Sequence, residues 1–325
     1  MNNKKPKLVC VGETFLTRPA AHHVPFFEKH FDISDYDPNL KYDKSHNFVY
    51  RTDDALKQVA KHKGQGSKFI ADGLWEKFFW CDNNFDRETL GLVNNGLFDN
   101  KRVVQVPKWF WFEEHIGQNA RKSLVSVSDN TQTNTFLMQI GKEKTERKNL
   151  LKKLNAEGLL DNALYSILYE GRSLEGDAGT YRPETRNFDQ RNYDPEWYNK
   201  TKFTVVVEAT WDALTFVTEK TFKPIMYRHP FIVFGNPLTL DSLKSWGFET
   251  YPQLFDEQYD LEMDIDRRCD LIVKQIKNLA TKRTIPYCEK SIEHNFNRFW
   301  DSALVERLMY SEMVEPILNF LSESR

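Results

Sequence analysis

Apolar and polar positions alternate along the chain in blocks that predict strands followed by helices. Short apolar runs of the kind found in buried parallel strands recur through both halves: Lys7–Gly12, Phe69–Ala71, Arg102–Val106, Phe136–Ile140, Phe203–Val207 and Pro230–Phe234. Longer amphipathic segments predict helices: Thr52–Lys63, Glu143–Glu157, Leu238–Trp246, Ile265–Ala280 and Ser291–Leu321. This alternation predicts an α/β protein with two Rossmann-like parallel-sheet domains facing a cleft.

The polar stretch Ser126–Thr135 is the best candidate for a linker between the two halves. We therefore expect a first domain over residues 1–128 and a second over residues 135–296.

Composition narrows the class of protein. The 325 residues include 45 basic and 47 acidic side chains, and a net charge of −2 gives no overall attraction to nucleic acid or anionic membranes. The four cysteines show no paired spacing, so we expect buried thiols rather than disulfides. Without an apolar signal segment or a long apolar run, the sequence predicts a soluble, cytoplasmic protein that does not bind a membrane.

The segment Phe203–Ile225 carries the most chemistry. A strand delivers Glu208 at its carboxyl end, and Thr218-Glu219-Lys220 then opens a helix. Ligands of open α/β sheets bind at this edge, where helix N-termini attract anions. A carboxylate can bind sugar hydroxyls while the lysine and the helix end hold a diphosphate. The alternative is plain capping by Thr218, with a solvated Lys220. Pro224 predicts that the helix kinks or starts late.

This segment resembles the donor-binding motif of the α-1,3-fucosyltransferases. The matching residues are Val207-Glu208-Ala209, Phe216-Val217-Thr218-Glu219-Lys220 and the strand and turn of Pro230–Pro237, with a departure at Ala209, where the family prefers Asn. The resemblance implies a glycosyltransferase of the GT-B architecture, or a viral or phage-type relative. It implies a C-terminal segment, residues 297–325, that crosses back to the first domain. The implied reaction moves a sugar from a GDP- or UDP-sugar to an acceptor hydroxyl, with inversion and no further cofactor.

The resemblance also suggests roles for donor-binding residues. Glu219 is the expected ribose ligand, and Glu208 either holds sugar hydroxyls or only pairs with a basic neighbour. A second cation beside Lys220 is expected to stabilise the diphosphate. Arg147 matches the family's arginine best, and Lys144 or Arg121 are the alternatives. The competing interpretation of Arg147 is a solvated helix face with i,i+4 ion pairs.

The base is expected in the first half of the chain. Glu113 and Glu114 follow the aromatic cluster Lys108–Phe112, where loss of hydration would raise a carboxyl pKa toward a useful value. The cluster is similar to the family's Lys-Trp-x-Trp stretch, which leads into its catalytic glutamate. His115 is a competitor, and the alternative is that the aromatic residues are core and the acids cap the next element.

Metal and acceptor are the remaining questions. Asp264-Ile265-Asp266 has the spacing of a metal-binding motif but stands where it would cap a helix, so we expect metal-independent activity. Basic and aromatic residues in Gly171–Lys200, among them Trp197 and Tyr198, suit a carbohydrate or a nucleic acid. Overall neutrality favours a glycan or a small polar acceptor. The alternatives are a DNA glycosyltransferase acting on hydroxymethylated bases and a non-catalytic protein that binds sugar nucleotides or glycans.

Overall fold

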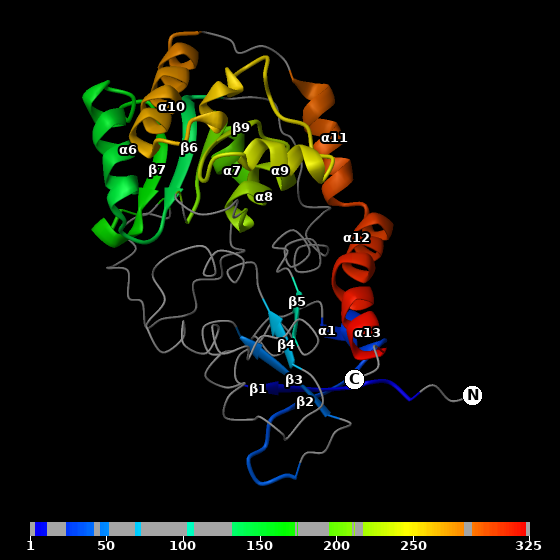
Figure 1. Cartoon of the computed structure of the whole chain (residues 1–325). Helices are drawn as coiled ribbons and strands as arrows, with labels where there is room; N and C mark the ends of the chain where they lie inside the picture. Colours follow the sequence, from blue (N-terminus) through cyan, green and yellow to red (C-terminus); the bar gives the residue numbers. More distant parts are fainter. Residues whose placement is uncertain are drawn as a thin grey trace. The chain divides into compact units, whose positions relative to one another are not determined.

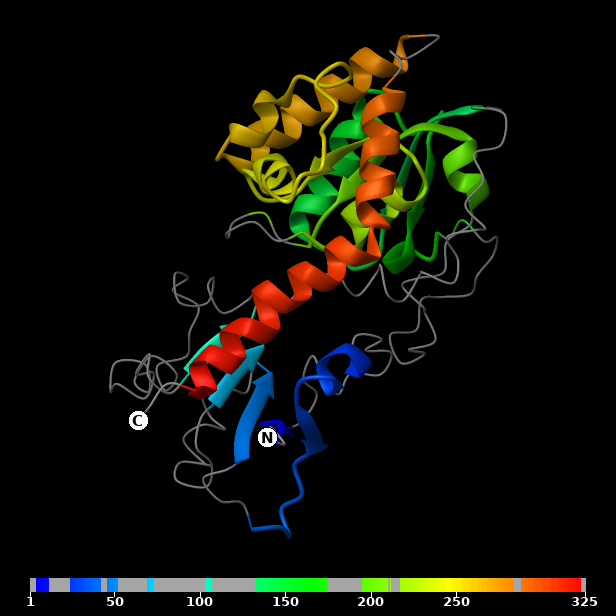
Figure 2. The same ribbon diagram turned by 90° about the vertical axis from the view of Figure 1, so that its right-hand side faces the viewer.

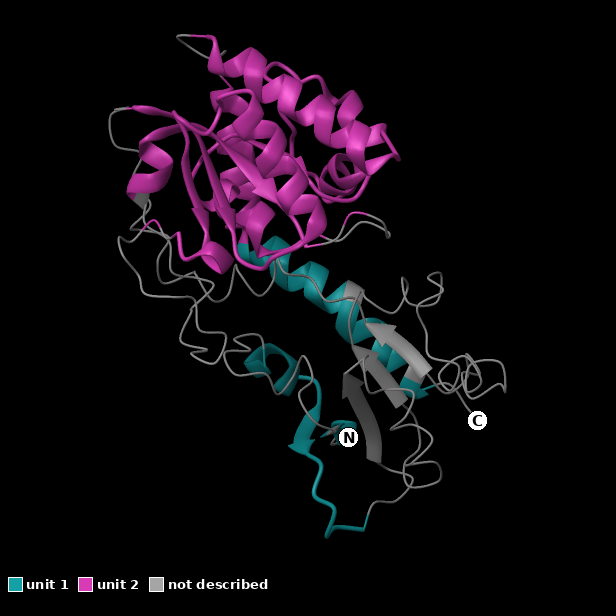
Figure 3. Cartoon of the chain, turned by 90° about the vertical axis from the view of Figure 1, so that its left-hand side faces the viewer, with its two compact units in different colours: residues 1–117, 302–325 teal, residues 118–301 magenta. Residues whose placement is uncertain are grey.

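A computed structural model describes most of the second half of the chain and parts of the first. The described residues are 4–11, 24–41, 46–51, 69–72, 103–106, 132–172, 174, 195–209, 211, 217–282 and 288–322. The chain divides into two compact units (Figure 3): unit 1 comprises residues 1–117 and 302–325, and unit 2 comprises residues 118–301. These bounds differ by several residues from those predicted at 128 and 297.

Unit 2 is built on a four-stranded parallel sheet with the order β7-β6-β8-β9. Its strands are β6 (Asn134–Ile140), β7 (Leu164–Ile167), β8 (Thr201–Val207) and β9 (Phe231–Phe234). Nearly every residue of β8 and β9 is buried, as expected of a parallel sheet that helices cover on both faces. The sheet therefore supplies the core of this unit.

Helices lie between successive strands of this sheet in the chain and also follow its last strand, β9. They are α6 (Thr145–Ala156), α7 (Pro195–Asn199), α8 (Glu219–Met226), α9 (Thr239–Ser245), α10 (Ile265–Ala280) and α11 (Glu289–Phe299). The chain steps from β6 to β7 in one direction and from β8 to β9 in the other, so right-handed crossovers put α6 and α8 on opposite faces. Accordingly, α6 packs against α10, and α8 packs against α11 (Figure 1; Figure 2).

The sheet of unit 2 has a topological switch point between β6 and β8. These two strands are neighbours, but the connections that follow them leave in opposite directions. In doubly wound sheets the crevice outside the carboxyl ends of two such strands is the usual place for a ligand. The connections that follow β6 and β8 are therefore the first places to look for a site.

Unit 1 contains a second parallel sheet, of five strands, with the order β2-β1-β3-β4-β5. Its elements are β1 (Lys7–Val11), α1 (Val24–Glu28), β2 (Asp32–Asp35), β3 (His46–Arg51), β4 (Phe69–Asp72), β5 (Val103–Val106), α12 (Ser302–Met309), a π-helical turn (Tyr310–Val314) and α13 (Glu315–Ser322). Within this unit α13 packs beside β5, and the His30 ring meets Tyr310 at a centroid distance of 5.4 Å.

The predicted α/β class is confirmed, with one Rossmann-like parallel sheet in each unit; that the two face a cleft stays a prediction. All six predicted strands are present, and α6, α9 and α10 confirm three of the predicted helices. The segment Ser291–Leu321 is not one helix, because α11 ends at Phe299 and α12 begins at Ser302. The helix predicted over Thr52–Lys63 lies outside the described residues.

Further expectations concern cysteines and membrane spans. Cys10, Cys269 and Cys288 are buried free thiols, as predicted, and Cys81 lies outside the described residues. In the part of the chain that the structure describes, no helix has both the length and the apolar character needed to cross a membrane.

His229 predicts a pH dependence of the stability of unit 2. Its Nε2–H donates to the Thr201 carbonyl at 2.8 Å, Thr204 Oγ1 lies 2.8 Å from Nδ1, and burial lowers its pKa to about 4. Between pH 6.5 and 4, His229 becomes protonated in the unfolded chain but stays neutral in the folded protein. The free energy of unfolding should therefore decrease as the pH is lowered through this window, by ~3 kcal/mol at pH 4.

Urea denaturation of the wild type and His229→Gln at pH 7, 6, 5 and 4 measures this difference. The variant should lose less stability on acidification than the wild type. Parallel pH profiles for the two proteins would show that His229 does not titrate in this way.

Candidate functional site

The five residues predicted to bind the donor belong to one hydrogen-bonded network at the switch point of unit 2. Arg147 Nη2 donates to the Glu208 carbonyl at 2.9 Å, and the Glu208 carboxylate accepts from Thr218. Lys220 Nζ donates to Thr218 Oγ1 at 3.1 Å and to Glu219 Oε1 at 2.7 Å. Residues that are far apart in the sequence thus meet where β6 and β8 end.

Glu208 ties the end of β8 to the start of α8. Its side chain has no exposed surface, and its carboxylate accepts from Thr218 N at 3.0 Å, Thr218 Oγ1 at 2.6 Å and Thr221 Oγ1 at 2.7 Å. A Cβ added to Gly235, the residue after β9, would lie 3.2 Å from the Glu208 Cβ, so a larger residue there would press against Glu208. Both carboxylate oxygens therefore hold the start of α8 in place, and a role of Glu208 in sugar binding stays a prediction.

Thr218 caps α8, as the capping interpretation predicted. Its Oγ1 accepts from Lys220 N at 3.4 Å, and its carbonyl accepts from Thr221 N at 3.1 Å. The helix begins at Glu219 and contains Pro224, so the predicted late start is wrong. Because the N–H groups of Lys220 and Thr221 already donate to Thr218, they are poorly placed to bind a diphosphate.

Glu219 and Lys220 form an ion pair beside this cap. Burial alone would raise the pKa of Glu219, but the charges of Lys220 and Lys223 outweigh it and hold the pKa below its ordinary value. Burial lowers the pKa of Lys220, and the charges of Glu219 and Glu208 outweigh that effect and raise it. Both side chains are therefore charged at neutral pH. Only 27% of the surface of the Lys220 side chain is exposed, so the interpretation of Lys220 as a solvated lysine is wrong.

Arg147 lies in the first turn of α6 and is buried, with 3% of its surface exposed. Besides Glu208, its guanidinium donates to the Lys142 carbonyl at 2.8 Å. Burial lowers its pKa, and the charges of Glu208 and Glu219 partly offset this. Its buried Nε has no hydrogen-bond partner among the described residues. The solvated-face interpretation is therefore wrong for Arg147, although it holds for Lys148, which is exposed and pairs with Glu143.

Two further residues join this network. Lys144 Nζ donates to the Ala209 carbonyl at 2.6 Å, which adds the alternative cation to the predicted one. Trp211, which sequence reasoning missed, is buried on Phe234 at a ring-centroid distance of 5.5 Å. Lys144 Nζ and Arg147 Cζ each lie 5.6 Å from its ring centroid, within reach of cation–π attraction. The only signal in the sequence is a tryptophan shortly after the carboxyl end of a strand.

The helix that follows β9 also has its N-terminus occupied by a protein group. The buried carboxylate of Asp260 accepts from Thr239 N at 3.1 Å and Leu240 N at 2.9 Å, and burial raises its pKa to about 6. The N-terminus of α6, at Lys144, has no side-chain cap. Among the described helices α6, α8 and α9, which come first after β6, β8 and β9, only α6 begins without a side chain that caps it, and Lys144 and Arg147 lie at that N-terminus.

The Asp-x-Asp spacing is explained by capping and packing. Asp264 Oδ1 accepts from Arg267 N at 2.9 Å and caps α10, as the capping interpretation predicted, while Asp266 accepts from Asn149 of α6. Within the described residues, no group of three or more His, Cys, Asp or Glu side chains is arranged to hold a metal ion.

Several predicted residues are not tested by the structure. Glu113, Glu114 and His115 lie outside the described residues, as do the aromatic cluster before them and Arg121. Most of the predicted acceptor region also lies outside them. Trp197 and Tyr198 of α7 are described, and they pack in the core with Leu137 rather than forming a binding surface.

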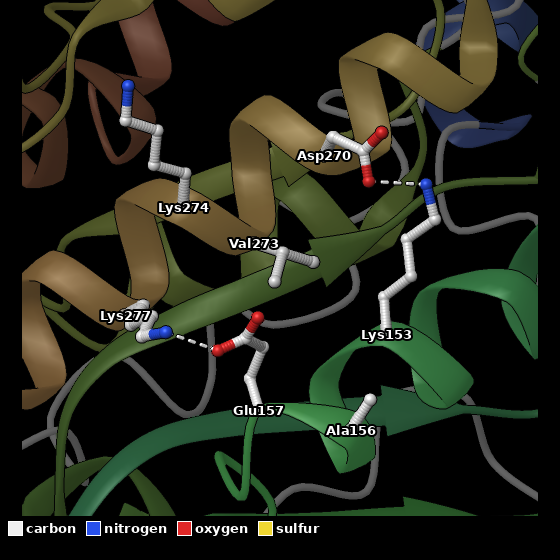
Figure 4. A pocket seen from close by; sticks show the side chains of 7 residues that line it. All are labelled: Lys153, Ala156, Glu157, Asp270, Val273, Lys274 and Lys277. Carbon is white, nitrogen blue, oxygen red and sulfur yellow. Dashed lines mark hydrogen bonds and ion pairs between the residues drawn. The ribbon is translucent and has the colours of Figure 1, made fainter.

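A cavity of about 330 Å³ lies between α6 and α10 (Figure 4), and none of the network residues lines it. Its walls carry two interhelical ion pairs, Lys153–Asp270 and Lys277–Glu157, and Lys274. The first turn of α6 contacts the network because Arg147 donates to the Glu208 carbonyl, and the first turn of α10 does so because Arg268 donates to the Trp211 carbonyl. The residues that line the cavity lie further along each helix. The cavity therefore does not share the loops at the carboxyl edge of the sheet.

Comparison with known proteins finds similarity in structure and none in sequence. No family model matches the sequence, and no curated protein matches it. Among solved structures, the chain is similar to a crystal structure of an α1,3-fucosyltransferase with GDP-fucose. The alignment covers 93% of each chain with 11% sequence identity and a TM-score of 0.41. At this level of similarity the match does not bear on the function of the chain.

The structure predicts that Glu208 is essential for stability. Glu208→Ala should leave Thr218 N–H and two threonine hydroxyls buried without an acceptor, which should lower the free energy of unfolding by roughly 3 kcal/mol in urea denaturation. Glu157→Ala is the matched control, because it removes only an exposed ion pair and should cost less than about 0.5 kcal/mol. Equal small losses in the two variants would mean that the hydrogen bonds of the Glu208 carboxylate to Thr218 and Thr221 contribute little to stability.

Proposed function

We propose that this protein is a glycosyltransferase that moves a sugar from a GDP- or UDP-sugar to an acceptor hydroxyl, with inversion and without a metal ion. The observation that carries the proposal is the network of Arg147, Glu208, Thr218, Glu219 and Lys220 at the switch point of unit 2. The sequence motif predicts that these residues bind the donor, and they occupy adjoining positions at the edge where doubly wound sheets bind ligands.

The charges of the network suit a diphosphate. Lys144, Arg147 and Lys220 bring three positive charges against the two carboxylates of Glu208 and Glu219. The N-terminus of α6 adds partial positive charge in the same place. A leaving nucleoside diphosphate gains negative charge as the glycosidic bond breaks, and fixed cations stabilise that charge most when water is excluded.

The same geometry suggests roles for the individual residues. Arg147, Lys144 and Lys220 bind the diphosphate. Glu219 accepts from a ribose diol through a carboxylate that Lys220 keeps charged. Thr218 and Glu208 position the lysine and the acid rather than touching the sugar.

For the other half of the reaction we propose a base from Glu113 or Glu114, with His115 as the competitor. The base accepts the proton of the acceptor hydroxyl as the oxygen attacks the anomeric carbon. A glycan or a small polar molecule is the proposed acceptor, because the net charge of −2 does not favour a polyanion.

Donor binding can be tested with GDP and UDP. Either nucleotide that binds should raise the melting temperature of the wild type by mass action. Arg147→Met and Lys220→Met should each weaken that nucleotide by about tenfold or more in calorimetric titration, because a charge-assisted hydrogen bond is lost. Lys274→Met, in the cavity between α6 and α10, is the matched control and should bind like the wild type.

Two outcomes would contradict donor binding at this network. The first is a wild type that binds no nucleoside diphosphate. The second is a loss of affinity in Lys274→Met with none in Lys220→Met, which would move the ligand to the cavity. Circular dichroism of each variant checks that the fold is retained.

The base is tested separately. In a panel of sugar nucleotides and acceptors, Glu113→Gln or Glu114→Gln should lower turnover by about a hundredfold or more while leaving nucleotide affinity unchanged. Turnover that is unchanged in both variants would remove them as the base and leave His115. A wild type that binds the donor but never turns over would favour the non-catalytic alternative.

A further inference from the structure

Arg268 is a second fully buried arginine beside the network, and neither the sequence motif nor the proposed reaction uses it. It lies in the first turn of α10 with 1% of its surface exposed. Its Nη1 donates to the Glu262 carbonyl at 2.7 Å, and its Nη2 donates to the Trp211 carbonyl at 2.9 Å. Its guanidinium therefore links α10 to the loop that follows β8.

This arginine is not explained by ion pairing. Among the residues that the structure describes, no carboxylate lies within ion-pair distance of it, although Asp260, Glu262 and Asp264 stabilise its charge from further away. Its buried Nε has no partner in the same set of residues. A buried charge held mainly by carbonyls contributes little to stability compared with an apolar side chain of similar size. A role in fixing the loop accounts for its presence better.

Three basic side chains hold the backbone of this loop. Arg147 donates to the Glu208 carbonyl, Lys144 to the Ala209 carbonyl and Arg268 to the Trp211 carbonyl. The first two are, together with Lys220, the cations proposed to bind a diphosphate. If Lys144 and Arg147 turn to phosphate oxygens, the hydrogen bond from Arg268 to the Trp211 carbonyl still holds the loop.

Trp211 connects Arg268 to those cations. Its carbonyl is held by Arg268, and its ring lies 5.6 Å from both Lys144 Nζ and Arg147 Cζ. Phe234 packs against the ring at a centroid distance of 5.5 Å. A shift of the Trp211 backbone would therefore move the aromatic surface against which both cations rest.

We propose that Arg268 is a positioning residue that fixes Trp211 against Lys144 and Arg147, so that these cations keep their places when an anion binds. Arg268 itself does not touch the ligand. The positioning of Trp211 stands on the geometry alone, and its consequence for nucleotide affinity rests on the proposed function.

The test uses the full chain labelled with 5-fluorotryptophan, with the Trp211 resonance assigned from Trp211→Phe. Arg268→Met and the milder Arg268→Lys should shift and broaden this resonance. Arg298→Met is the matched control, because Arg298 also donates to a tryptophan carbonyl, that of Trp246 at the end of α9. It should leave the Trp211 signal unchanged. Calorimetric titration with GDP and UDP follows on the same proteins.

Arg268→Met should weaken the nucleotide that the wild type binds by about tenfold, because preorganisation of the cations is lost. Arg268→Lys should lie between it and the wild type, while Arg298→Met should match the wild type. An unchanged Trp211 resonance in both Arg268 variants overturns the proposal, and so does an unchanged affinity in a protein that binds the nucleotide. If the wild type binds neither nucleotide, the proposed function fails, and the Trp211 resonance alone decides the role of Arg268.

Discussion

The buried carboxylate of Glu208 is the contact on which the candidate site depends. A carboxylate with no exposed surface is costly unless its oxygens accept hydrogen bonds, and here Thr218 and Thr221 supply them. The contact joins the end of β8 to the first turn of α8, while Arg147 secures the Glu208 carbonyl from α6. One residue thus fixes the relative positions of the elements that carry the basic side chains.

The topology explains why these residues meet. The chain leaves β6 and β8 in opposite directions, so the connections that follow them diverge and bring their first turns to one edge of the sheet. Side chains already accept from the N-terminal N–H groups of two helices at this edge, Thr218 at α8 and Asp260 at α9. What is left at this edge is the N-terminus of α6 with Lys144 and Arg147, beside Lys220.

Local pattern predicted the fold class and most elements, because buried parallel strands and amphipathic helices have strong periodicity. It missed β2, whose four residues Asp-Ile-Ser-Asp are mostly exposed at a sheet edge, and β7, another short edge strand. It also missed β3, which lies between β1 and β4 and whose sequence His-Asn-Phe-Val-Tyr-Arg has only a short apolar run. The site was predicted as a set of residues but not as a set of contacts. The contact of Glu208 with α8, like the contacts of Trp211 and Arg268, is a tertiary contact that spacing along the sequence cannot reveal.

A crystal structure of the protein with GDP or UDP would test the central claim most directly. If unit 2 binds a nucleoside diphosphate at its switch point, phosphate oxygens should lie within hydrogen-bond distance of Arg147 and Lys220, near the N-terminus of α6. A nucleotide seated in the cavity between α6 and α10, or phosphates more than about 6 Å from these side chains, would contradict it.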